Sequence, residues 1–159
     1  MKLTPASLRK IFVSLSLVGA LCFSMNVTPS SQAMSQGNAK SLYQRVGGYD
    51  VLANIVDDFI GRLISDKQFE KFFAGFSNDS KKKIRQHLLD QLCAATGGPC
   101  VYMGRDMKTT HGGLGITEND WDVAVKHLTA SFDKAKVKKK EKDELLALVS
   151  SLKKDIVEK

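Results

Sequence analysis

Apolar residues recur at helical spacing along most of the chain after residue 40. Over 50–64 they repeat at i, i+4 and i+8, which predicts a helix with one broad buried face. A second helix is expected from Asp79 or Ser80 to about Thr96, ended by Gly97-Gly98-Pro99. Its apolar stripe comprises Ile84, Leu88, Leu92 and Ala95. No segment shows a convincing strand alternation, so the pattern predicts an all-α domain.

Four further helices complete the predicted set. Residues 41–46 predict a short helix closed by two glycines, and 104–111 predict another short, weak one. Thr117 begins a longer helix whose first turn is acidic, as suits the positive end of a helix dipole. A last helix is expected over 139–157. We expect residues 41–157 to form one domain.

The first 33 residues have the pattern of a secretory signal peptide. A basic start is followed by a 13-residue apolar run, Ile11 to Phe23, which is short for a membrane span. Small residues at Ser31 and Ala33 suit a cleavage site, so we expect cleavage after Ala33. An uncleaved signal anchor is the alternative. We expect 34–40 to be a flexible leader and the protein to be exported, with a periplasmic location in a host that has an outer membrane.

Charge and cysteine content exclude some functions and leave one question open. The formal charge of +7 includes basic runs at Lys81-Lys82-Lys83 and at 134–142, but no aromatic residues alternate with them. We therefore expect solvated surfaces and no nucleic-acid partner.

Cys93 and Cys100 either form a disulfide across the Gly-Gly-Pro turn or stay as free thiols. The chain has no HExxH, GxSxG or phosphate-binding loop.

The stretch around His111 carries the candidate chemistry. His111 ends a short predicted helix and is followed by glycines at 112, 113 and 115, which free the backbone to turn. From the residues alone, His111 is either a polar residue at a helix end or a ligand presented by that turn. Four phenylalanines in eight residues form either a core clamp or a wall for a flat aromatic ligand: Phe69, Phe72, Phe73 and Phe76.

Six short motifs in collinear order resemble the group I truncated haemoglobins. The resemblance extends from about 41 to 157 and implies an all-α truncated globin fold, a two-over-two helical sandwich around haem b. It rests on Leu42-Tyr-Gln-Arg-Val-Gly-Gly48, Val56-Asp-Asp-Phe59, Phe72-Phe-Ala-Gly75, Gly97-Gly98-Pro99, Tyr102-Met-Gly-Arg-Asp-Met107 and His111-Gly-Gly-Leu-Gly-Ile-Thr117.

The resemblance also implies roles for individual residues. His111 matches the proximal ligand to haem iron, and a neutral imidazole is a standard axial ligand. Phe73 matches a phenylalanine that packs against the haem, and Met107 and Ile116 are expected to line the proximal side. His127 also matches a family histidine, for which we expect a structural role.

On the opposite side, the chain departs from the family pattern. Many members have a tyrosine where this chain has Ile60 and a glutamine where it has Leu88, and Ile84 is also apolar. Losing a hydrogen bond to a bound oxygen molecule costs roughly 1–3 kcal/mol, which is about one to two decades in affinity. Tight oxygen binding, and oxygen-dependent conversion of nitric oxide, are therefore placed in doubt.

His87 could occupy that side in place of the missing hydrogen-bond donor, because it matches a histidine that binds iron as a sixth ligand in some cyanobacterial relatives.

Three functions follow from these residues. The first is reversible binding of O2, CO or NO at iron held by His111. The second is a bis-histidyl His87/His111 protein for electron transfer or redox chemistry of NO, nitrite or peroxide, with an unknown electron donor. The third is a haem-free helical interaction module. We expect a monomer or weak dimer.

Overall fold

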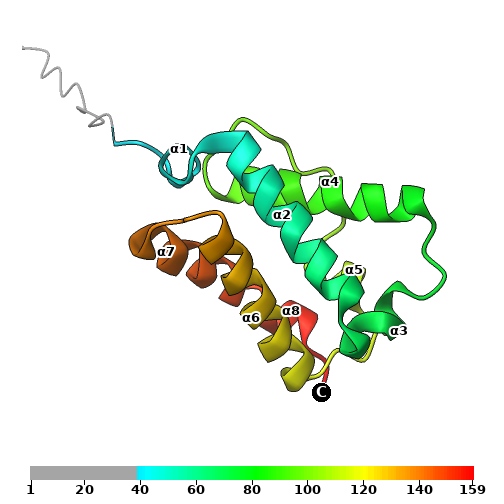
Figure 1. Cartoon of the computed structure of the whole chain (residues 1–159). Helices are drawn as coiled ribbons and strands as arrows, with labels where there is room; N and C mark the ends of the chain where they lie inside the picture. Colours follow the sequence, from blue (N-terminus) through cyan, green and yellow to red (C-terminus); the bar gives the residue numbers. More distant parts are fainter. Residues whose placement is uncertain (1–38) are drawn as a thin grey trace, which may run out of the picture. The chain divides into compact units, whose positions relative to one another are not determined.

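The structure, a computed structural model, describes residues 39–159, so the predicted signal peptide (1–33) and most of the leader lie outside the described residues. All regular elements of the described part are helical (Figure 1). They are α1 (Leu42–Val46), α2 (Gly48–Ser65), the 3-10 turn η1 (Lys67–Phe69), α3 (Glu70–Phe73), α4 (Asn78–Ala95), α5 (Met107–His111), α6 (Glu118–Lys134), α7 (Lys139–Ser150) and α8 (Lys153–Ile156). Among these helices, none combines the length and apolar character needed to cross a membrane.

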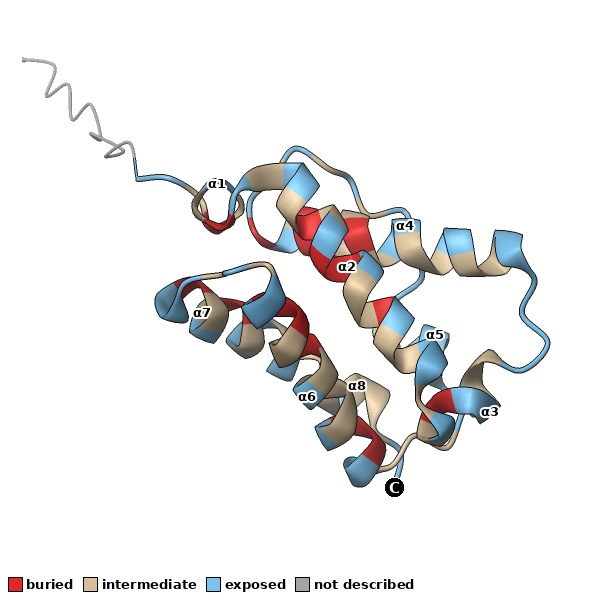
Figure 2. Ribbon diagram, in the orientation of Figure 1, coloured by how far each residue is buried: buried red, intermediate tan, exposed pale blue. Residues whose placement is uncertain are grey.

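Helix α2 is the centre of the domain and contacts both α4 and α6, while α6 also packs against α7 (Figure 1). The buried positions lie where these helices face one another (Figure 2). Side chains that are wholly or almost wholly buried come from all four helices and include Leu52, Ile55, Val56, Leu89, Phe132 and Leu145. Burial of each such side chain contributes about 1.5–3 kcal/mol, so this shared core holds the four helices together.

Side-chain caps determine where several helices begin. Ser41 and Thr117 each form a capping box, with Gln44 and Asp120 respectively. Asp106 caps α5 by accepting the Thr109 backbone N–H, so this helix begins at Met107 and not near residue 104 as the sequence predicts. The predicted beginning at Thr117 is confirmed, since it is the N-cap residue of α6.

Helix α4 differs from the prediction at its start and in its buried face. Ser77 is the N-cap, accepting the Ser80 backbone N–H, so α4 begins at Asn78 instead of after a cap at 79 or 80. Leu89, which the predicted stripe omitted, is fully buried, and Ala95 is exposed. The buried face of α4 is therefore rotated toward α2 relative to the predicted stripe.

The predicted continuous helix over 139–157 is wrong, because the chain turns between α7 and α8. The Ser151 hydroxyl donates to the Leu148 carbonyl, and the Leu152 N–H donates to the Val149 carbonyl. Serine competes for backbone hydrogen bonds in this way, and the resulting tight turn interrupts the helix. After this interruption, α8 contacts α5.

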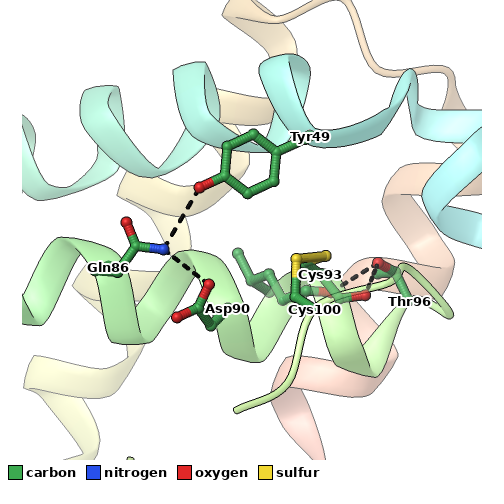
Figure 3. The surroundings of a disulfide bond; sticks show 7 residues. Tyr49, Gln86, Asp90, Cys93, Thr96 and Cys100 are labelled. Atoms are coloured by element: carbon green, nitrogen blue, oxygen red, sulfur yellow. Dashed lines mark hydrogen bonds between the residues drawn. A yellow bond between two sulfur atoms is a disulfide. The ribbon is translucent and has the colours of Figure 1, made fainter. Parts of the chain in front are cut away.

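Cys93 and Cys100 form a disulfide at the end of α4, which answers the question that the sequence left open (Figure 3). Gly97 adopts φ +81°, which lets the chain reverse direction between the two cysteines. The Gly98 N–H then donates to the Cys93 carbonyl at 2.8 Å. The bridge therefore ties the end of α4 to the loop that leads to α5.

Candidate functional site

The imidazole of His111 has one nitrogen engaged by its own helix. Nδ1 lies 2.9 Å from the Met107 backbone oxygen, one helical turn earlier. Because a carbonyl only accepts, we assign the proton to Nδ1, which leaves the lone pair of Nε2 available to a metal. A hydrogen bond of this kind fixes the orientation of the ring. His111 is thus a preoriented, half-buried donor at the end of α5.

The chain leaves α5 through a loop that needs glycine. Gly113 and Gly115 have φ values of +82° and +67°, in the region that L side chains rarely adopt. The Leu114 N–H donates to the His111 carbonyl at 3.2 Å, which closes the turn. The sequence prediction of a sharp turn directly after His111 is confirmed.

Three phenylalanines near α3 keep part of their surface outside the core. Phe69 is only 6% exposed, but Phe72 and Phe73 are half-buried and Phe76 is 42% exposed. The rings of Phe73 and Phe76 pack edge to face, with 6.1 Å between their centroids. The core-clamp interpretation therefore fits Phe69. The Phe72 ring contacts Phe69 and lies under the Lys71 ammonium, which is 4.5 Å from the ring centroid, so Phe73 and Phe76 are the two available to an apolar ligand. Met107 and Ile116, on the α5 side, are also half-buried.

The positions on α2 and α4 that the resemblance assigns to the side of the haem opposite His111, here called the distal side, are apolar. Ile60 is 8% exposed and belongs to the core cluster, and the half-buried Ile84 and Leu88 pack against that cluster. None of these three side chains has a hydrogen-bond donor.

His87 is exposed on α4, and its ring contacts the edge of Tyr102 at 6.2 Å between centroids. The Tyr102 hydroxyl donates to the Arg105 carbonyl at 2.6 Å, and burial, with a contribution from Asp106, raises the pKa of Tyr102. In the described part of the chain, no hydrogen bond or aromatic contact joins His87 to His111. Tyr102 lies in the motif Tyr102-Met-Gly-Arg-Asp-Met107, but its contact with His87 joins two segments that only the fold brings together.

The remaining ionisable groups of interest have structural partners. His127 Nε2 lies 2.8 Å from an Asp66 carboxylate oxygen, in agreement with the structural role expected for it. Asp58 interacts with Lys134, Arg62 and Ser131, and the hydrogen bonds from Lys134 and Arg62 hold its pKa well below the usual range. Asp58 is therefore a charged member, at neutral pH, of an ion-pair network between α2 and α6.

Comparison with known proteins identifies the family. The sequence model of the bacterial-like globin family matches residues 41–158. The chain belongs to this family. It is 34% identical to the group 1 truncated haemoglobin of Mycolicibacterium paratuberculosis over 112 residues, which cover 70% of this chain and 80% of that protein.

Solved structures of truncated haemoglobins confirm the fold predicted from the sequence. The protein from Tetrahymena pyriformis, in its Fe(III) form, matches with a TM-score of 0.68 at 22% identity, over 76% of this chain and 100% of that one. The 2/2 haemoglobin of Synechococcus, solved with covalently attached haem, matches with a TM-score of 0.66 at 26% identity, over 74% of this chain and 98% of that one.

The residues of this globin fit the haem that its family implies. One imidazole nitrogen is free and oriented, and partly exposed aromatic and aliphatic side chains stand on α3, α4 and α5. A planar macrocycle needs this combination of one strong donor and apolar surface. The protein is a haem-binding truncated globin.

Proposed function

We propose that this protein binds haem b through Nε2 of His111 and reversibly binds oxygen or another diatomic gas on the opposite side. The observation that carries the proposal is the hydrogen bond between His111 Nδ1 and the Met107 carbonyl, which presents Nε2 as the ligand. When bound through His111, haem would supply an iron that can take up a diatomic gas.

The protein's own residues orient the ligand and exclude water. The Asp106 cap and the bond to Met107 hold the His111 ring. Met107 and Ile116 provide apolar surface on the proximal side, and Phe73 provides an aromatic ring to pack against the haem. On the distal side, Ile60, Ile84 and Leu88 provide apolar surface without a donor. We therefore expect small gases to enter, but oxygen to be held about one to two decades less tightly than in a site with a buried donor.

Visible absorption spectra of the haem-loaded protein test the histidine assignment. His111→Gly is expected to abolish the histidine-ligated ferrous spectrum, and added imidazole is expected to restore it. His127→Ala is the matched control, because it removes a histidine bonded to Asp66 and should leave the spectrum unchanged. A His111→Gly protein with the wild-type spectrum would contradict the proposal.

A second candidate function is a bis-histidyl haem protein that exchanges electrons with an unknown donor. It is favoured by His87, which lies directly beside Leu88 on α4. The His87 imidazole is exposed, and its only aromatic contact in residues 39–159 is with Tyr102. A low-spin ferrous spectrum that is lost in His87→Ala would establish His87 as the sixth iron ligand and favour this second function. Fast carbon monoxide binding, unchanged in His87→Ala, would favour the gas binder.

We also propose that the protein is exported, after cleavage of residues 1–33, and acts as a monomer or weak dimer. The support for export is the basic, apolar and small-residue order of that segment, together with a disulfide, which persists in oxidising compartments. Cell fractionation with mass determination of the mature chain tests it. Full-length protein recovered with reduced cysteines from the cytoplasm would contradict the proposal.

A further inference from the structure

The segment after α8 is fastened to the loop that follows His111. One carboxylate oxygen of Glu158 accepts the Gly113 N–H at 2.5 Å, and the other accepts the Gly115 N–H at 3.2 Å. The Glu158 N–H donates to the Ile116 carbonyl at 2.9 Å. The Glu118 N–H donates to the Lys159 carbonyl, also at 2.9 Å. Side-chain and backbone bonds therefore join the same two segments.

The glycine loop has the geometry of a backbone anion site. Positive φ values at Gly113 and Gly115 turn their N–H groups toward a common acceptor, and such arrangements bind anions. Here the acceptor is the protein's own carboxylate. A charged acceptor gives stronger hydrogen bonds than a neutral one, so Glu158 holds the loop more firmly than water would.

This attachment acts close to the iron ligand. His111 is two residues before Gly113, and its carbonyl accepts the Leu114 N–H inside the loop. Helices α5 and α8 also contact each other. The direction in which α5 presents His111 therefore depends on where the loop is held, and Glu158 is the side chain that holds it.

We propose that Glu158 is a positioning residue for haem: its carboxylate holds the Gly113–Gly115 loop and so sets how α5 presents the His111 imidazole, whose ring is fixed within the helix by the Met107 carbonyl. The inference rests on the proposed function, in which His111 is the proximal ligand. It assigns to Glu158 a role in the strength of the iron–histidine bond and in the retention of haem.

The test compares Glu158→Ala with the conservative Glu158→Gln, using haem-loaded protein. Asp143→Ala is the matched control, because it removes an exposed carboxylate that pairs with Lys139 on α7. The measurements are the iron–histidine stretching band of the ferrous protein by resonance Raman, the rate of haem transfer to apomyoglobin, and amide exchange of residues 112–118 by mass spectrometry.

Glu158→Ala is expected to shift the stretching band, to speed haem loss about 3–10-fold and to speed loop exchange about 10-fold, in line with the loss of one or two charge-assisted bonds. Glu158→Gln keeps one oxygen acceptor and is expected to lie between Glu158→Ala and wild type. Asp143→Ala is expected to match wild type. If Glu158→Ala does not fold, the Glu158→Gln band shift carries the test.

An unchanged band in a folded Glu158→Ala protein overturns the positioning role, even if haem loss is faster, because a purely structural role changes stability alone. Equal effects of Glu158→Ala and Asp143→Ala overturn it as well. Failure of the proposed function is distinguishable, since wild type itself would then lack a band that depends on His111.

Discussion

Breaking the disulfide is expected to destabilise the domain by an amount that can be worked from its position. The bridge joins residues seven positions apart, with 5.7 Å between the Cα atoms. Cross-linking a loop of this length removes unfolded-chain entropy worth about 2.5 kcal/mol at 25 °C. Cys100→Ala breaks the bridge but leaves the fully buried Cys93 side chain in the core, so it isolates the loop contribution from a cavity.

The assay is urea unfolding of the haem-loaded wild type and Cys100→Ala proteins, after mass spectrometry has confirmed the bridge in wild type. With an m-value of about 2 kcal/mol/M, the urea midpoint of the variant should fall by about 1–1.5 M. Val101→Ala, a neighbouring substitution at a 70% exposed position, is the control and should change stability by less than about 0.5 kcal/mol. A Cys100→Ala midpoint equal to that of Val101→Ala would refute the reasoning.

Three further predictions concern the distal side, the ion pairs and the turn after α4. Leu88→Gln places a donor on the apolar distal side and should raise oxygen affinity about 10-fold; equilibrium oxygen titration measures this, with Leu88→Met as the control. The folded-state pKa of Asp58 lies below its ordinary 3.8, so its stabilising contribution is present above about pH 4 and is lost as the pH falls further. Urea unfolding at pH 7 and pH 3.5 should therefore show a smaller acid-induced loss in Asp58→Asn than in wild type, and equal losses would contradict this. Gly98→Ala would place a Cβ 2.6 Å from the Tyr43 ring and 2.8 Å from the Cys93 carbonyl oxygen. Thermal unfolding should therefore show a free energy of unfolding lower by about 1–3 kcal/mol, and an unchanged melting temperature would contradict this.

The predictions that succeeded from sequence were those that depend on neighbouring residues. Helix α2 was predicted to within two residues at its start and one at its end, because its apolar face repeats over several turns. The start of α6 followed from Thr117 and the acidic turn after it. The proposed role of His111 also began from its place between a short helix and several glycines, together with the resemblance that these residues carry, and it stays a prediction. The structure adds the bond from Nδ1 that leaves Nε2 free.

The predictions that failed depended on residues far apart in the chain. Leu89 is buried because α2 covers it, whereas a periodicity within α4 alone favoured a stripe that ran through Ala95. The break between α7 and α8 lies inside an apolar pattern that continues past it, and α8 contacts α5 only after the turn at Ser151. The disulfide was one of two open outcomes until the turn through Gly97 and Gly98 placed both cysteines together.

The sequence by itself determined the class of the fold, the order of its main helices and the candidate ligand, because periodicity, caps and glycine breaks act over a few residues. Only the tertiary structure decided that Tyr102 contacts His87 and that Glu158 holds the loop after His111. Glu158 and Gly113 are 45 positions apart. No local pattern encodes such a contact, because it forms only when α5 and α8 pack against each other.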